Sequence, residues 1–299
     1  MVRAMFGSRP GIRAPVAAGR FYEAEGRRCA LQAGELCTTV GGAAVPEALF
    51  GALVPHAGWI YSGRTAGIAL ATLAEHTNAR TFVLLGSVHT VDIKEPALDT
   101  AEAWATPMGE VAVDAQLRQE MAQLADFSTR DEAHRFEHSL EVQLPLMQTV
   151  FGEQLQIVPC LIPPQPEAPD WGRALGEMLR RRPVPTAIIA SSDLTHYGPS
   201  YGFIPHGAGR EGTRWAHETN DRQLLDLIER LDADAALAHA LDHHSACGGG
   251  AIAATVSACR IMGAQHGYVL QHTDSTQVAA GQIWGETTNS VGYAAVVFG

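Results

Sequence analysis

The stretch FGALVPHAGWIYSG, residues 50–63, sets out the basic unit of the fold. Its first part, residues 50–55, is a short apolar run, which is typical of a strand covered on both faces. Alanine and leucine then recur at helical spacing over residues 63–75, so a helix is expected to follow. His56 lies between the two. The stretch therefore predicts a strand–helix unit with a histidine at the carboxyl end of its strand.

The same alternation continues along the chain. Five further apolar runs are predicted strands: residues 81–86, 155–162, 186–190, 268–272 and 291–298. Five further segments with helical spacing are predicted helices: residues 138–151, 171–181, 221–228, 233–241 and 250–262. Residues 101–114 alternate loosely and contain Pro107 and Gly109, which indicates an inserted hairpin. The pattern predicts an α/β fold with a central mixed, mostly parallel sheet flanked by helices.

The 299 residues contain no repeat, low-complexity tract or linker, so one domain over residues 1–299 is expected, with residues 1–12 as a flexible extension. The formal net charge of −11 is spread along the chain, which disfavours nucleic acid and anionic membranes as partners. No apolar run is long enough to span a bilayer, and the N-terminus lacks a signal-peptide core. We therefore expect a soluble, cytoplasmic protein.

Five cysteines are scattered without CxxC spacing. Because the number is odd and the chain is long enough to form its own core, we expect reduced thiols rather than disulfides. Cys160 and Cys259 lie in apolar surroundings and are predicted to be packed in the core. Cys247 differs, because it precedes three glycines and a predicted helix. A helix N-terminus favours a thiolate there, and the glycines let the backbone approach a ligand closely.

Polar residues follow three of the predicted strands. His56 follows the first, His89 follows the second, and Asp193 and His196 follow the strand at 186–190. In open α/β sheets ligands bind at the carboxyl ends of the strands, so these side chains should meet at one rim. Imidazoles combined with a thiolate suit iron, copper or zinc, and they do not suit magnesium or calcium. The sequence therefore indicates a transition-metal or catalytic site at this rim.

Each signal also has a simpler explanation. A single histidine at a strand end is more often a hydrogen-bonded polar residue than a ligand. Asp193 beside His196 is also compatible with a helix cap, and the glycines after Cys247 with a tight loop. Glu137 or Ser139 is equally suited to capping a first helical turn. What favours a site is the coincidence of ligand-type residues at three strand ends and one helix start.

Several blocks containing these residues resemble one known family. The blocks are RAPVAAGRFY at 13–22, PHAGWIYSG at 55–63, GSVH at 86–89, EHSLEVQLP at 137–145, SSDLTHYG at 191–198, ACGGGAI at 246–252 and SVGYAAVVF at 290–298. In this order, and over nearly the whole chain, they resemble the Memo-like family, known in prokaryotes as AmmeMemoRadiSam system protein B. The resemblance implies a fold similar to that of the class III extradiol (LigB-like) dioxygenases, in which a non-haem iron opens catechol rings.

Carried over to this sequence, the resemblance implies a metal site of His56, His89 and Cys247. Asp193 and His196 would line the same pocket, with Asp193 orienting His196 as the catalytic acid or base. The other residues expected in the pocket or behind the ligands are Glu137, His138, Trp59, Tyr61, Ser192 and His244.

This sequence departs from the animal members of the family in two places. Thr90 stands where they have a second histidine, and Cys247 is followed by Gly-Gly-Gly rather than Gly-Arg-His. Both changes remove side chains near the pocket and leave the three proposed ligands intact. We therefore expect substrate contacts to differ from those of the animal proteins.

Three functions are open on the sequence alone. The first is a metal-dependent redox enzyme, an oxidase or dioxygenase of a small molecule, with Fe²⁺ as the expected cofactor and copper or zinc as alternatives. The second is a metal-free cysteine hydrolase with Cys247 as nucleophile and the following amides as oxyanion hole. The third is a non-catalytic protein that binds a metal or a partner through a vestigial dioxygenase pocket. The resemblance also implies a radical-SAM protein and an AMMECR-like protein as partners.

Overall fold

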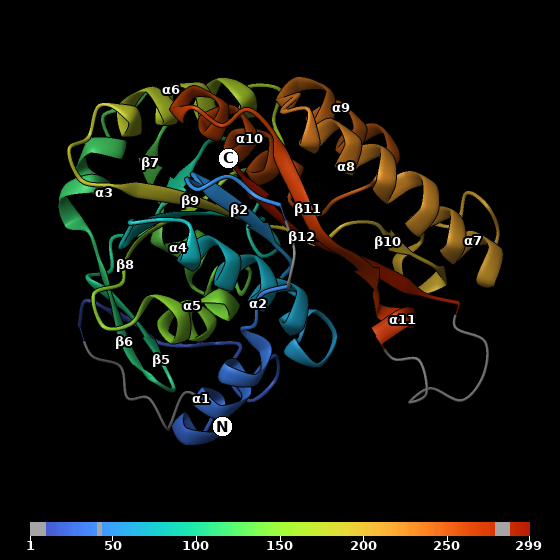
Figure 1. The fold of residues 1–299 in the computed structure, drawn as a ribbon, viewed down its shortest axis with the longest axis horizontal. Coiled ribbons are helices and arrows are strands. Elements are labelled where there is room, and N and C mark those ends of the chain that lie inside the picture. Colours follow the sequence, from blue (N-terminus) through green and yellow to red (C-terminus); the bar gives the residue numbers. More distant parts are fainter. Residues whose placement is uncertain (1–9, 41–43, 279–287) are drawn as a thin grey trace.

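The computed structural model describes residues 10–40, 44–278 and 288–299. A twisted sheet runs through the molecule, with helices on both faces (Figure 1). Its centre consists of four parallel strands, in the order β8 (Gln156–Leu161), β3 (Thr81–Gly86), β9 (Thr186–Ser191) and β2 (Gly51–Val54). β12 (Ser290–Phe298) then adds antiparallel to β2. The predicted mixed, mostly parallel sheet is therefore confirmed.

Shorter strands extend the sheet on both sides. They are β6 (Gly109–Val113), β5 (Ala103–Thr106), β1 (Ile12–Arg13), β4 (Ala97–Leu98), β7 (Ser128–Thr129), β10 (His196–Tyr197) and β11 (Gly267–Asp274). β5 and β6 form the predicted hairpin, whose second strand pairs parallel to β8. Of the predicted N-terminal extension, residues 1–9 lie outside the described residues, whereas Ile12 already pairs with Ala103.

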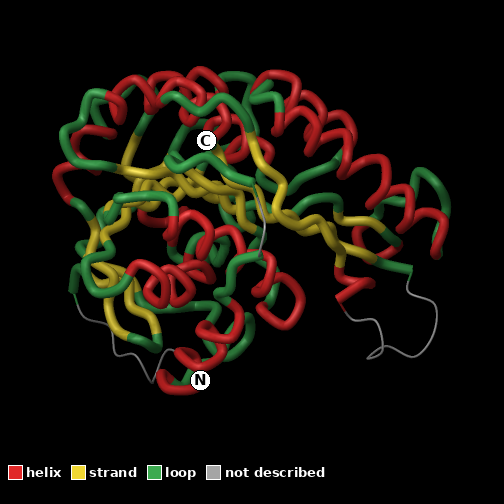
Figure 2. Tube along the Cα trace, viewed as in Figure 1, coloured by secondary structure: helices red, strands yellow, loops and turns green. Residues whose placement is uncertain are grey.

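Two layers of helices cover the sheet (Figure 2). One layer contains α1 (Gly26–Leu36), α2 (Trp59–Glu75) and α5 (Leu144–Phe151). The other contains α3 (Ala115–Met121), α6 (Ala168–Arg180), α8 (Arg222–Glu229), α9 (Ala233–His243) and α10 (Gly249–Met262). Successive residues of each central strand alternate between these two cores, so Val54 packs in the first and Leu53 in the second. Burial of both strand faces explains the continuous apolar runs of the sequence.

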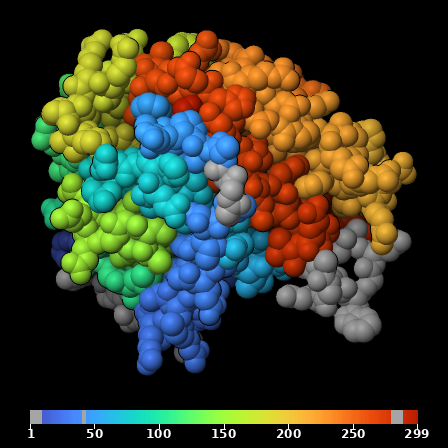
Figure 3. Space-filling view, viewed as in Figure 1, coloured from blue at the N-terminus to red at the C-terminus, as the bar shows by residue number. Residues whose placement is uncertain are grey.

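The remaining short elements lie around the carboxyl ends of the strands and in the C-terminal half. They are α4 (Asp131–His134), α7 (Arg210–Trp215), α11 (Ser275–Val278), the 3₁₀ turns Glu141–Gln143 and Pro199–Tyr201, and a π-helix, η4 (Ala216–Asp221). In Figure 3, β11 and the segment from α7 to α9 lie side by side on one flank of the molecule. No helix in the described ranges is long and apolar enough to cross a membrane.

The helix predicted over residues 138–151 begins later than expected. Residues 138–140 form a turn, a 3₁₀ turn follows, and the α-helix begins at Leu144. The N–H groups of His138 and Ser139 are bonded to the Glu137 carboxylate at 2.9 Å instead of entering a helix. Pro145 lacks an N–H and fits the first turn of the helix that follows. The spacing of apolar residues does not reveal that a side-chain carboxylate competes with the helix for these backbone N–H groups.

Candidate metal centre

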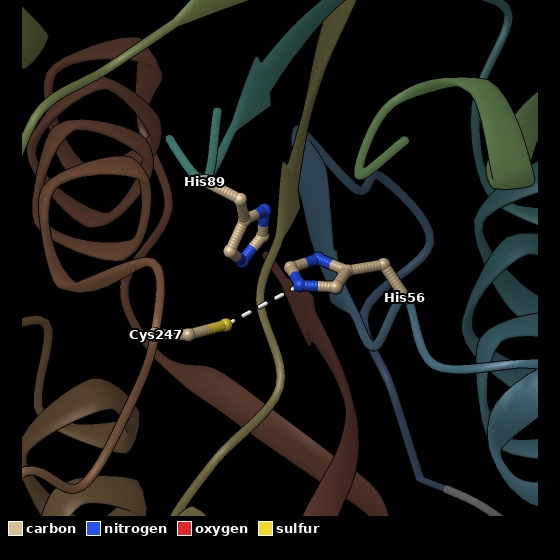
Figure 4. A group of neighbouring side chains, drawn as sticks. All are labelled: His56, His89 and Cys247. Atoms are coloured by element: carbon tan, nitrogen blue, oxygen red, sulfur yellow. Dashed lines mark hydrogen bonds between the residues drawn. The ribbon is translucent and has the colours of Figure 1, made fainter. Parts of the chain in front are cut away.

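Three segments bring His56, His89 and Cys247 together (Figure 4). His56 lies two residues after β2, His89 three residues after β3, and Cys247 two residues before α10. The parallel strands β3, β9 and β2 are neighbours, so their carboxyl ends meet at one rim. The Cys247 Sγ lies 3.3 Å from the His56 Nε2, and the candidate ligand atoms of all three residues lie within 4.8 Å of one another. The structure thus assembles the predicted trio.

The hydrogen bonds of His56 fix which ring nitrogen faces the thiol. The Ser191 hydroxyl donates its proton to the Ser139 carbonyl at 2.6 Å and accepts from Gln143 Nε2. It therefore has no proton left for His56, whose Nδ1 lies 3.1 Å away and must donate to it. The lone pair of neutral His56 is consequently on Nε2, the atom that points at Cys247.

His89 is held in the same tautomer by Glu137. Its Nδ1 lies 2.9 Å from one oxygen of the Glu137 carboxylate, and its backbone N–H donates to the other at 2.8 Å. A carboxylate that accepts from the far nitrogen of a histidine is the usual support of a metal-ligating imidazole. Glu137 itself is almost fully buried, and hydrogen bonds to His89 and the backbone, against the opposing effect of burial, hold the pKa of its carboxyl well below the ordinary value.

Cys247 is placed by close backbone packing. Its N–H donates to the Asp193 carbonyl at 3.3 Å, and the next N–H, of Gly248, donates to the Ser192 hydroxyl at 2.9 Å. A side-chain carbon at Gly248 would lie 2.2 Å from the Ser87 Oγ, so this approach requires glycine. Although burial opposes it, the imidazole and hydrogen bond of His56 bring the pKa of Cys247 well below its usual value. Because the thiolate is the form of cysteine that binds metal, this shift favours metal ligation by the sulfur.

Asp193 and His196 follow β9 as predicted, but they contact different groups. One Asp193 oxygen accepts the backbone N–H of His56 at 2.7 Å and that of Ala57 at 3.3 Å. The other oxygen is 3.8 Å from the His196 Nε2, longer than a hydrogen bond. Asp193 therefore fixes the His56 backbone, and the Nε2 of His196 has no hydrogen-bond partner among the described residues.

A cavity of about 440 Å³ opens beside the trio. Its wall includes six of the predicted site residues: His56, His89, His138, Asp193, His196 and Tyr61. Burial and the neighbouring His56 lower the pKa of His138 to about 4, so this imidazole is neutral near pH 7. The ring of His138 stacks on that of His89, with centroids 5.0 Å apart. The cavity therefore combines polar imidazoles with an aromatic wall.

A second cavity, of about 320 Å³, reaches the same cysteine from another direction. Cys247, His244 and His196 line it. His244 ends α9 in the left-handed conformation, with φ of 49°, and its ring meets Phe203 edge-on. Ser192 lies behind the thiolate, with its hydroxyl 3.8 Å from the Sγ. His244 and Ser192 are therefore close to Cys247 rather than in the wall of the larger cavity.

Trp59 is the exception among the predicted pocket residues. Its side chain is buried in the core, where the indole N–H donates to the Val142 carbonyl at 3.0 Å and the ring packs on Tyr22. It is the first residue of α2, and an apolar first turn facing the core buries the indole beneath the site. Of the two positions expected for Trp59, in the pocket or behind the ligands, the structure thus rules out the cavity wall.

The sequence analysis missed three aromatic residues of the cavity wall: Phe21, Tyr201 and Tyr293. Phe21 is placed by an anchor on the buried Glu141, which accepts from Arg13 and from the hydroxyl of Tyr22 at 2.8 Å. Phe21 then lies with its ring centroid 4.5 Å from that of His138. The sequence could have indicated Phe21, because two aromatic residues follow a glycine in the block at residues 13–22.

The donor set fits a transition-metal ion. Zinc–sulfur bonds of about 2.3 Å and zinc–nitrogen bonds of about 2.0 Å imply roughly 3.5 Å between neighbouring donors of a tetrahedral ion. The observed 3.3 Å between the Cys247 Sγ and the His56 Nε2 is close to this separation. Both imidazoles have their other nitrogen occupied as a donor, to Ser191 and Glu137. His56 and His89 face the larger cavity and Cys247 the second one, so an ion held by the three would have coordination positions left for a small molecule.

Comparison with known proteins identifies the family of this chain. A family model described as Memo-like protein matches residues 13–297. A MEMO1 family protein of Thermococcus kodakarensis is 32% identical over 96% of this chain and 99% of its own length. One from Methanopyrus kandleri is 34% identical over 96% and 98% of the two chains. An uncharacterized Escherichia coli K12 protein of known structure superposes with a TM-score of 0.47 at 14% identity, over 84% of this chain and 100% of its own. The chain belongs to the Memo-like family.

Proposed function

We propose that the protein is a redox enzyme that holds non-haem iron on His56, His89 and Cys247 and acts on a small molecule. One observation carries this proposal: two imidazoles with their Nδ1 atoms committed as donors turn their Nε2 atoms toward one thiolate. Separate support for each imidazole is characteristic of metal ligands. Iron would supply activation of dioxygen or polarisation of a substrate oxygen. Copper and zinc suit the same donors.

The residues around the trio have distinct tasks in this proposal. The partly exposed ring of His196 lines both cavities, and we assign this imidazole the role of proton acceptor or donor. Asp193 positions His56 through the backbone. The larger cavity has an aromatic lining, formed by Phe21, Tyr61, Tyr201 and Tyr293. Its volume of about 440 Å³ suits a small aromatic molecule with polar substituents. We therefore expect phenolic substrates to be the first to test.

A metal-free cysteine hydrolase has one observation in its favour, the 3.3 Å contact between Cys247 and His56. Other observations limit it. The N–H groups of Cys247 and Gly248 already donate to the Asp193 carbonyl and the Ser192 hydroxyl, so of the amides expected to form the oxyanion hole only those of residues 249–251 would be left for it. A hydrolase also has no need for His89 on the other side of the sulfur. We therefore rank it below the metal-dependent reaction.

Elemental analysis after purification without oxygen or added metal tests the metal centre. We expect about one equivalent of iron in the wild type that Cys247→Ala and His89→Ala remove. His266→Ala is the matched control, because this exposed histidine lies far along the chain in a turn next to β11. Metal content that is the same in all four proteins would refute the proposal. Oxygen consumption by the iron-loaded protein with phenolic substrates then separates an enzyme from a non-catalytic metal-binding protein.

A further inference from the structure

A second group of potential ligands lies between η4 and β11. It consists of His217 and Asp221 from the π-helix and His272 and Asp274 from the strand, and we refer to these four side chains as the second cluster. The His272 Nε2 is 3.4 Å from the Asp221 carboxylate, and the His217 Nδ1 is 3.5 Å from the Asp274 carboxylate. Donors at 2.0–2.2 Å from a tetrahedral ion would be roughly 3.3–3.5 Å apart. These two separations are close to that value, and the ligand atoms of His217, Asp221 and His272 lie within 4.8 Å of one another.

The backbone of both elements is shaped to place these donors. His217 and Asp221 are four residues apart in a π-helix, a rare helix geometry that is frequently found at functional sites. His272 and Asp274 are two residues apart in β11 and so project from the same face of the strand. A register shift between Val269 and Gln271 precedes them and turns the strand locally. Each element thus contributes one imidazole and one carboxylate.

The charges of the second cluster are unbalanced. Asp221 and Asp274 have side chains that are 1% and 7% exposed, and among the described residues no lysine or arginine pairs with either. Arg222, next in the chain, instead pairs with Asp226 and Glu229. Two buried carboxylates with no lysine or arginine beside them among the described residues are an environment that a cation would stabilise.

Hydrogen bonds to residues outside the second cluster orient its donor atoms. The Asp274 Oδ1 accepts from Thr276, so its Oδ2 is left for the histidine side. The buried His217 Nδ1 has no hydrogen-bond partner among the described residues, and its Nε2 meets the Gln277 amide at 3.2 Å. The Gln277 Oε1 accepts from the Thr273 hydroxyl at 3.2 Å, so the amide NH₂ faces the ring and donates to His217 Nε2. Binding of an ion at Nδ1 would therefore move the ring proton to Nε2 and turn this amide over. Asp221 is pressed against Gly292, where a side-chain carbon would come within 2.0 Å of its Oδ2.

We propose that the second cluster is a structural binding site for a divalent transition-metal ion with nitrogen and oxygen ligands, represented by Zn²⁺. The ion would join β11 to the π-helix and so hold the C-terminal flank against the sheet. It would also bear on the main cavity, because the other Asp221 oxygen accepts the Thr195 N–H and Ser275 follows Asp274 in the cavity wall. This site is separate from the iron centre and stands whether or not the protein is a redox enzyme.

Zinc binding in a variant without the main centre tests the proposal. His89→Ala combined with Cys247→Ala removes two ligands there, and we expect this full-length protein to retain one zinc per chain by elemental analysis. Adding His217→Gln and His272→Gln should lower zinc affinity at least a hundredfold in competition with a chelating dye. The matched control is His239→Gln with His243→Gln, because these two residues form another histidine pair, on α9, with ring centroids 4.6 Å apart. The control should bind as before.

A Co²⁺ titration of the wild type covers the case in which the combined variant fails to fold. The thiolate-to-cobalt charge-transfer band reports the main centre, so the second equivalent should add ligand-field absorption without increasing that band. His217→Gln with His272→Gln should abolish the second equivalent alone. One equivalent in the wild type, zinc that survives the cluster substitutions, or zinc lost in the α9 control would each overturn the proposal.

Discussion

Replacing Glu137 with glutamine should separate the support of His89 from general stability. The carboxylate accepts four N–H groups: the backbone and Nδ1 of His89 and the backbone of His138 and Ser139, all at 2.8–2.9 Å. In the variant, the amide oxygen should take the place of the carboxylate oxygen that accepts three of these N–H groups. The NH₂ group then faces the backbone N–H of His89, which is left without an acceptor. A lost charged hydrogen bond contributes about 1.5–3 kcal/mol, so we expect a loss of about 3 kcal/mol.

For a chain of 299 residues the entropy of unfolding is about 0.6 kcal/mol per degree, so this loss corresponds to a fall in Tm of about 5 °C. Metal affinity should fall by about 10- to 100-fold, because the neutral amide no longer raises the basicity of His89. The two quantities are measured by thermal unfolding of the metal-free protein and by chelator competition.

Glu141→Gln is the matched control. Glu141 is equally buried and accepts from Arg13, Val16, Ala17 and Tyr22, but it does not contact His89. It should lower Tm by a comparable amount and leave metal affinity within a factor of about three. Equal loss of affinity in both variants, or an unchanged affinity in Glu137→Gln, would show that the carboxylate does not support a metal ligand.

Three further changes probe the main centre. Gly248→Ala places a carbon 2.2 Å from the Ser87 Oγ and should therefore displace Cys247. We expect the metal content to fall and Tm to drop by several degrees. A normal metal content would contradict the position assigned to Cys247. Ser191→Ala removes the acceptor of the His56 Nδ1 and should weaken metal binding about tenfold, as measured by chelator competition. An unchanged affinity would contradict the assigned tautomer of His56. Stripping metal with a chelator should speed iodoacetamide labelling of Cys247, as mapped by mass spectrometry, whereas a rate independent of metal would favour the hydrolase.

Much of the fold could be predicted from the sequence because its strands are buried on both faces. The apolar run at residues 81–86 coincides with β3, and the hairpin at 101–114 contains β5 and β6. The predicted packing of Cys160 and Cys259 is also confirmed, since both are fully buried. The π-helix could not be predicted in this way, because its apolar spacing is close to that of the α-helix that continues from it.

The meeting of His56 and His89 could be anticipated because parallel strands present their carboxyl ends at one edge. Their tautomers could not, since these depend on Ser191 and Glu137, partners 135 and 48 residues away in the sequence. Which of its two expected positions Trp59 takes could not be predicted either, because it depends on the side of α2 that packs in the core.

The loop after β9 connects the two candidate sites. Asp193 holds the His56 backbone through its carboxylate and the Cys247 N–H through its carbonyl, while the Thr195 N–H donates to Asp221 of the second cluster. The same loop is also bonded to β12, because the Leu194 N–H donates to the Gly292 carbonyl and the Gly292 N–H donates to the Thr195 carbonyl. The loop after β9 therefore positions both His56 and Cys247 of the main centre and also contacts the second cluster, so a change in either site should be transmitted to the other through this loop.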